Sequence, residues 1–141
     1  MITIRHVVCD REPYSVPDTA TALDAAEYMA GRNIGAVCVL DGEGKLCGIF
    51  SERDLLKRVV IRGLDPAAAP IRDVMSEPRA VIDCADTPHK ALERMEQVGS
   101  RHLPVVDGEK FVGMLSMRDI MRVEISEQGA ELQLLHEYIS H

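Results

Sequence analysis

Residues 48–55 read Gly-Ile-Phe-Ser-Glu-Arg-Asp-Leu, and residues 113–120 read Gly-Met-Leu-Ser-Met-Arg-Asp-Ile. The two stretches share Gly, Ser, Arg and Asp at the same spacing and lie 65 residues apart. Upstream, residues 39–42 match residues 105–108 at an offset of 66. The one-residue difference falls in a Gly-containing turn, where an insertion is well tolerated. Two copies of one unit therefore account for nearly the whole chain.

The hydrophobic pattern of each copy predicts a strand, a helix, two strands and a second helix. In the first copy a short extended segment ends at Pro17, and Asp18 or Thr19 is positioned to cap a helix with apolar side chains at three-to-four-residue spacing. Two short apolar runs, 35–40 and 46–50, predict strands joined by a turn, and a helix follows from Ser51. The second copy predicts the same elements at 80–82, 87–98, 103–106, 111–115 and from Ser116 onward.

These copies define the domain boundaries that we expect. The first repeat spans residues 8–62, a Pro/Ala-rich linker spans 63–70, and the second repeat spans 71–124. Residues 125–141 have no counterpart in the first copy. They predict an amphipathic C-terminal helix, from the spacing of Ile125, Gln128, Leu132, Leu135 and Ile139. Two interpretations of this helix stay open: packing on its own domain, or a contribution to a dimer contact.

Composition narrows the class of protein. Sixteen Lys and Arg against 23 Asp and Glu leave a formal net charge of −7 over 141 residues, which argues against a general binder of nucleic acid or anionic membranes. The absence of Trp, with three Tyr and two Phe, argues against a base-stacking platform. The beginning of the sequence has no apolar run of signal length, and no stretch approaches a membrane span. We therefore expect a cytoplasmic protein.

The cysteines and histidines point to neither a metal site nor catalysis. The cysteines at 9, 38, 47 and 84 have no Cys-x-x-Cys spacing and no His partners at zinc-finger spacing. We expect reduced thiols, with a disulfide between Cys38 and Cys47 across a hairpin as an open alternative. His102 has no nucleophile and orienting partner at a recognisable spacing, so we expect no catalytic residue.

The duplicated Gly-x-x-Ser-x-Arg-Asp motif has two interpretations. Ser-x-x-Asp before an apolar run resembles a capping box, in which the side chains satisfy backbone N–H groups at the start of a helix. Capping, however, requires neither the preceding Gly nor the Arg beside the Asp. A helix N-terminus with a hydroxyl and a guanidinium suits a phosphate, whereas an ionised Asp suits the 2′ and 3′ hydroxyls of a ribose. The motif therefore also indicates a nucleoside phosphate.

The repeat, its element order and the duplicated motif resemble tandem CBS domains, a pair of which forms a Bateman module. The resemblance covers residues from about 8 to 124. It implies an α+β, sandwich-like fold in which two βαββα repeats pack by their sheets with pseudo-twofold symmetry and leave two clefts. In this family the clefts commonly bind adenosine compounds: AMP, ADP, ATP, NAD or S-adenosylmethionine. The resemblance also implies a homodimer.

The resemblance assigns site residues by position in the motif. The Asp would hold the ribose, the Ser would bind ribose or phosphate, and the Arg would lie near the phosphates: Ser51, Arg53 and Asp54 in the first repeat, and Ser116, Arg118 and Asp119 in the second. Arg101 and His102 resemble the basic pair that precedes a Pro-Val strand in this family and are further phosphate candidates. The apolar residues expected along the adenine pockets and the adjoining strand are Val16, Ile34, Gly35, Ala36, Val37, Val81, Ile82, Leu103 and Pro104.

We therefore expect a regulatory module for signal transduction or energy sensing, not an enzyme, with an adenosine nucleotide as ligand and no catalytic cofactor. A protein effector would read the ligand state. The basic pair is present only in the second repeat, because residues 33–36 of the first read Asn-Ile-Gly-Ala. We expect the two clefts to differ in affinity or in ligand. The alternative function is a structural or adaptor homodimer whose nucleotide clefts are vestigial.

Overall fold

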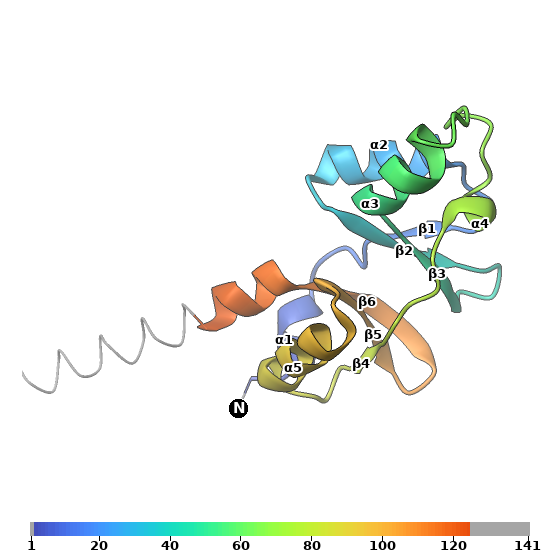
Figure 1. Cartoon of the computed structure of the whole chain (residues 1–141). Helices are drawn as coiled ribbons and strands as arrows, with labels where there is room; N and C mark the ends of the chain where they lie inside the picture. Colours follow the sequence, from blue (N-terminus) through green and yellow to red (C-terminus); the bar gives the residue numbers. More distant parts are fainter. Residues whose placement is uncertain (1, 125–141) are drawn as a thin grey trace, which may run out of the picture.

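The first repeat folds around a three-stranded sheet in the order β1-β2-β3 (Figure 1). β1 (Ser15–Pro17) runs parallel to β2 (Ala36–Leu40), and β2 runs antiparallel to β3 (Leu46–Ser51). A parallel pair needs a crossover connection, which α2 (Ala22–Arg32) supplies. After β3 the chain continues through α3 (Glu52–Asp54) into the π-helix η1 (Leu55–Val60). This computed structural model describes residues 2–124.

The second repeat has the same topology, with a three-stranded sheet in the order β4-β5-β6. β4 (Ile82–Asp83) is parallel to β5 (His102–Asp107), β5 is antiparallel to β6 (Lys110–Ser116), and α5 (Pro88–Val98) makes the crossover. Residues 117–124 are helical and continue directly from β6. The predicted α+β class is confirmed. The predicted C-terminal helix at 125–141 lies outside the described residues.

Local sequence sets the ends of the two crossover helices. Thr21 and Thr87 are their N-caps, and each side chain accepts a hydrogen bond from the N–H three residues on. Both helices end at a left-handed residue, Asn33 (φ 53°) and Gly99 (φ 66°). The cap predicted at Asp18 or Thr19 is wrong, because the Asp18 N–H still donates to the Leu40 carbonyl at the end of the sheet.

Each repeat completes its core with a short helix that precedes the other repeat. α1 (Ile4–Val8) places Ile4 and Val8 in the core of the second repeat. α4 (Ile71–Val74) places Ile71 and Val74 in the core of the first repeat. The boundaries expected at 8 and 71 therefore follow the sequence repeat and do not separate the two cores.

A third apolar cluster joins the two sheets. Ala36 and Cys38 of β2 pack against Met114 of β6, and the Cys38 thiol lies 3.9 Å from the Met114 sulfur. Burial raises the pKa of the Cys38 thiol well above its usual range. The four cysteines all lie within residues 2–124 and are free, so the alternative disulfide between Cys38 and Cys47 is not formed.

The described residues meet the requirements of neither a membrane-spanning helix nor a metal site. Within residues 2–124, no helix is long and apolar enough to cross a bilayer. The same residues contain no group of three or more His, Cys, Asp or Glu side chains arranged to hold a metal ion.

Candidate functional site

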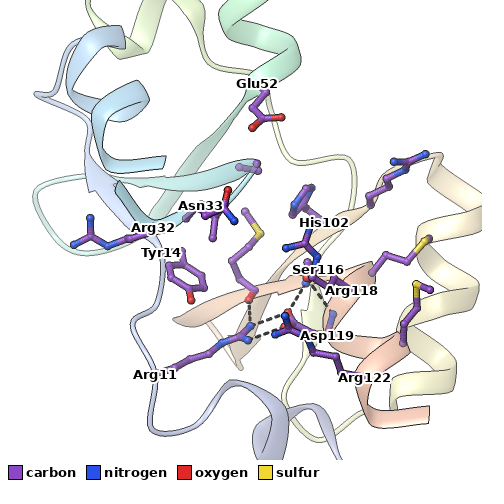
Figure 2. Close-up of a pocket in the computed structure, with 17 residues that line it drawn as sticks. Arg11, Tyr14, Arg32, Asn33, Glu52, His102, Ser116, Arg118, Asp119 and Arg122 are labelled. Atoms are coloured by element: carbon purple, nitrogen blue, oxygen red, sulfur yellow. Dashed lines mark hydrogen bonds and ion pairs between the residues drawn. The ribbon is translucent and has the colours of Figure 1, made fainter. Parts of the chain in front are cut away.

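A cavity of about 940 Å³ lies between the two repeats, beside the start of helix 117–124 (Figure 2). The first repeat contributes the end of α2 and the beginning of β2, and the second contributes β5, β6 and helix 117–124. The segment between α1 and β1 closes one side with Arg11 and Tyr14. The predicted site residues that line the cavity are Ile34, Gly35, Ala36, Arg101, His102, Ser116, Arg118 and Asp119.

Several apolar residues expected in the adenine pockets lie elsewhere. Val16 and Val37 are buried in the core of the first repeat, and Ile82 and Leu103 in that of the second. The reason is strand alternation: in β2, Val37 and Val39 face the core of the first repeat, whereas Ala36 and Cys38 face the other sheet. The remaining predicted residues that do not line this cavity are Ser51, Arg53, Asp54, Val81 and Pro104.

The Ser-x-x-Asp motif forms a capping arrangement in both repeats. The Ser116 N–H donates to Asp119 Oδ2 at 2.8 Å, and the Asp119 N–H donates to Ser116 Oγ at 3.2 Å. Ser51 and Asp54 make the equivalent bonds at 3.0 and 3.2 Å. Capping thus explains the Ser and Asp spacing, and it also fixes each carboxylate at the end of a strand.

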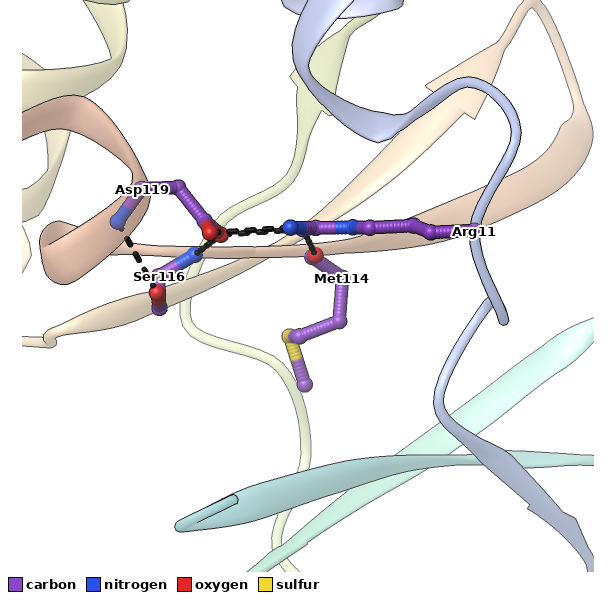
Figure 3. A network of polar contacts seen from close by, with 4 residues as sticks. All are labelled: Arg11, Met114, Ser116 and Asp119. Atoms are coloured by element: carbon purple, nitrogen blue, oxygen red, sulfur yellow. Dashed lines mark hydrogen bonds and ion pairs between the residues drawn. The ribbon is translucent and has the colours of Figure 1, made fainter. Parts of the chain in front are cut away.

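Arg11 holds the Asp119 carboxylate through both of its oxygens (Figure 3). Nη1 donates to Oδ1 at 2.8 Å, and Nη2 donates to Oδ2 at 2.9 Å and to the Met114 carbonyl at 2.6 Å. The Arg11 and Asp119 side chains are only 24% and 11% exposed. Burial by itself raises the pKa of Asp119, but the hydrogen bonds from Arg11 and Ser116 outweigh burial and hold that pKa below its usual value. The pair is therefore ionised at neutral pH.

The equivalent carboxylate in the first repeat has a neutral neighbour in this place. Ser76 follows α4 as Arg11 follows α1, and its hydroxyl donates to Asp54 Oδ1 at 2.8 Å. Arg58 Nε lies 3.6 Å from the same oxygen, one turn further along the helix. The two Asp residues of the motif are therefore held by different chemistry.

The cavity is rich in arginine. Arg101, Arg118 and Arg122 line it, and within residues 2–124 no acidic side chain lies within ion-pair distance of them. Arg32 also lines it, but its Nε is 2.5 Å from Glu12 Oε2 and its guanidinium stacks 3.7 Å above the ring of Tyr28. Among residues 2–124, these three cationic side chains thus line the cavity without a carboxylate partner, while Glu52 of α3 is the acidic side chain that lines it besides Asp119.

A family model, described as the CBS domain, matches residues 4–61 and 71–126. The chain belongs to the CBS-domain family. Proteins built from CBS pairs are regulatory modules, and the two repeats described above are the two CBS domains of this chain.

Similar proteins agree with this assignment. A mitochondrial CBS domain-containing protein of Arabidopsis thaliana, CBSX3, is 34% identical over 125 residues, which cover 84% of this chain and 60% of that protein. An uncharacterised protein of Methanopyrus kandleri is also 34% identical, over 83% of this chain and 60% of its own length. The CBS pair thus spans about 60% of the length of these relatives.

Solved structures of CBS proteins superpose well on this chain. One from Burkholderia ambifaria has a TM-score of 0.81 at 27% identity, covering 90% of this chain and 96% of that one. A CBS-domain protein of Pyrobaculum aerophilum, solved in complex with AMP, has a TM-score of 0.75 at 30% identity, covering 84% and 89%.

The sequence interpretation of this CBS pair missed part of the cavity. Besides the predicted residues, Arg11, Tyr14, Arg32 and Arg122 line the cavity. A sequence signal for Arg11 exists: Val8-Cys9-Asp10-Arg11-Glu12-Pro13 aligns with Val74-Met75-Ser76-Glu77-Pro78 only if one residue is inserted near Arg11. An added residue before a strand is a local departure from the repeat.

Proposed function

We propose that this CBS pair is a regulatory module that binds an adenosine nucleotide (AMP, ADP, ATP or NAD) in the cavity beside Asp119, and that it is not an enzyme. The observation that carries the proposal is the combination, in one cavity, of a carboxylate at a helix N-terminus with Arg101, Arg118 and Arg122. A carboxylate suits ribose hydroxyls, and guanidinium groups suit phosphates. The AMP complex of the similar Pyrobaculum protein supports this choice of ligand.

The shape of the cavity supports an orientation of the ligand. The ribose lies at Asp119 and Ser116, and the phosphates point toward Arg101, just before β5, and toward the arginines of helix 117–124. The adenine lies against residues 34–36, which line the opposite wall where α2 leads into β2.

Ligand binding in this place bridges the two CBS domains. Residues of the first repeat and of the second line the same cavity, so a bound nucleotide favours one relative arrangement of the repeats. A second copy of the chain or an effector protein reads that arrangement. The equivalent residues Leu56 and Met121, one on each repeat, are 54% and 55% exposed, and exposed apolar side chains of this kind support a homodimer.

Calorimetric titration with AMP, ATP and NAD tests the proposal. Replacing Asp119 with Asn removes the charged acceptor of the ribose hydroxyls, so affinity should fall by about ten- to a hundredfold. Asp54→Asn is the matched control, because Asp54 has the same capping bonds but lies outside the cavity. The proposal is wrong if no nucleotide binds, and the placement is wrong if Asp54→Asn alone abolishes binding.

A structural or adaptor homodimer is the second candidate function. One observation favours it: both motif carboxylates already have protein partners, Arg11 on Asp119 and Ser76 on Asp54. In that case no adenosine compound raises the melting temperature, and the chain still forms a dimer in sedimentation experiments.

A further inference from the structure

Arg11 occupies the position that the ribose needs. Two ribose hydroxyls would donate to the Asp119 carboxylate, but Nη1 and Nη2 of Arg11 already donate to its two oxygens. The Ser116 N–H takes a further lone pair of Oδ2. A carboxylate has about four acceptor sites, and these three bonds leave one of them free. Both ribose hydroxyls can therefore donate to Asp119 only if Arg11 gives up at least part of this pair.

Arg11 cannot give up its partner without a replacement. Its side chain is only 24% exposed, and an unpaired guanidinium in such a place is strongly destabilised. Its Nε is buried and has no hydrogen-bond partner in the described structure. An anion that enters the cavity beside Arg11 can accept from the guanidinium and so compensates for the loss of Asp119.

We infer that Arg11 makes this cavity selective for phosphorylated ligands, because it releases the Asp119 carboxylate to the ribose only when an anionic group of the ligand takes over its guanidinium. A nucleoside presents the same ribose but no anion. It must either leave Arg11 unpaired or do without Asp119. A nucleotide satisfies both members of the ion pair at once, because its ribose hydroxyls donate to Asp119 and its phosphate accepts from Arg11. This inference rests on the function proposed above.

The first repeat lacks such a device. There the motif carboxylate accepts from the neutral Ser76 hydroxyl, and its charged neighbour Arg58, 3.6 Å away, is 40% exposed. Displacing either partner therefore leaves a charge that water can reach, unlike the 24% exposed guanidinium of Arg11. The selectivity is thus a property of the cavity beside Asp119 and coincides with the one-residue insertion near Arg11. The loop around it has an unusual backbone, with positive φ at Asp10 (59°) and Tyr14 (56°), and the Arg11 guanidinium lies 5.5 Å from the ring of Tyr14.

Titration of AMP and adenosine against wild type and Arg11→Gln tests the inference. In the variant, adenosine should bind about tenfold or more tightly than it does to wild type, because no charged competitor holds Asp119. AMP should gain less or lose affinity, so that the AMP-to-adenosine ratio falls. Arg5→Gln is the matched control: Arg5 also ties the N-terminal segment to the second repeat, through Asp107 at 3.2 Å, but does not line the cavity.

The outcomes separate this inference from the proposed function. If Arg11 were only a phosphate contact, Arg11→Gln would weaken AMP and leave adenosine unchanged, and the inference is then wrong while nucleotide binding stands. If wild type binds no nucleotide, both proposals are wrong. Should Arg11→Gln not fold, Arg11→Lys decides. Lysine keeps the charge but cannot span both carboxylate oxygens, so adenosine should still gain affinity, and an unchanged value overturns the inference.

Discussion

His102 is the histidine that lines the cavity. Burial lowers its pKa, and the carboxylates of Asp119 and Glu52 only partly oppose this effect, while Arg101 adds to it. The imidazole is therefore neutral at pH 7 and contributes a hydrogen-bonding group, not a cation. The positive charge for a phosphate has to come from the arginines.

The lowered pKa of His102 predicts a dependence of stability on pH. Because the unfolded chain binds this proton more tightly than the folded chain, stability is full above the ordinary pKa of 6.5 and is lost as the pH falls toward the lowered value. The melting temperature of wild type should therefore decrease more between pH 7.5 and pH 5.5 than that of His102→Asn.

His89→Asn provides the control for this measurement. The His89 side chain is 79% exposed and lies on α5, so this variant should follow the wild-type profile. If all three proteins lose the same number of degrees, His102 is not the group responsible.

At the scale of single residues, the sequence predicts the Ser-x-x-Asp motif but not the side chains that bind its carboxylate. Ser116 and Asp119 could be found because they are repeated, and the capping bonds explain their spacing. Arg11 could not be placed by periodicity, since it lies in an irregular segment 108 residues from the carboxylate that it binds. Val37 was misplaced because β2 is apolar on both faces, so its composition does not reveal which side chains face the cavity.

At the scale of elements, Gly48 and Gly113 occupy equivalent places in β3 and β6. Each is the glycine that precedes the Ser of the duplicated motif by three residues. In the structure, the close neighbour is the protein's own chain: a Cβ on Gly48 would overlap the sulfur of Met75, whereas a Cβ on Gly113 would lie 3.5 Å from Val8. The glycine of the first repeat is therefore required for packing and that of the second is not.

Alanine substitutions at these two glycines should have unequal effects. Gly48→Ala should lower the free energy of unfolding by about 1–2 kcal/mol, because the Met75 side chain has to move out of the way. The loss is not larger because a methionine side chain is flexible and can adopt another conformation. Gly113→Ala adds an ordinary van der Waals contact and should be within about 0.5 kcal/mol of wild type. Urea denaturation of both variants checks this difference, and equal losses would contradict it.

The order of elements was predictable, but the detail of their ends was not. The predicted helix 87–98 agrees closely with α5 because Thr87 and Gly99 mark its ends in the sequence. β4 is shorter than the predicted strand 80–82 because only Ile82 and Asp83 find partners on β5. In η1 the Ile61 N–H donates to the Leu56 carbonyl, five residues back, a spacing that an apolar pattern does not distinguish from an ordinary helix.

For the whole molecule, α1 and α4 each pack into the core of the repeat that they do not directly precede, and this arrangement predicts a single cooperative unit. Removing α1 would damage the core of the second repeat, and removing α4 would damage the core of the first repeat. The third cluster, around Cys38 and Met114, adds direct contact between the sheets. The two repeats should therefore unfold together.

Ile4→Ala tests this cooperativity from the edge of the chain. Ile4 is fully buried in the second core, so its truncation should lower the free energy of unfolding by about 2–5 kcal/mol. Amide hydrogen exchange should show an equal loss of protection for the backbone amides of β5 and for those of β2, which belongs to the other repeat. Ile2→Ala, at a side chain 36% exposed, should have little effect. Faster exchange in β5 alone would mean that the repeats open independently.

The position of Arg11 just after α1 also limits how the cavity can respond. Three peptide units separate Val8, which is fixed in the second core, from Arg11, and such a length spans roughly 10 Å when fully extended. While α1 remains docked, Arg11 therefore stays within about this distance of Val8 and can pivot toward an incoming anion. A motion of this kind is a loop and side-chain rearrangement, on the order of nanoseconds to microseconds. On the function proposed above, the cavity can respond to a ligand through this rearrangement alone, with α1 still docked.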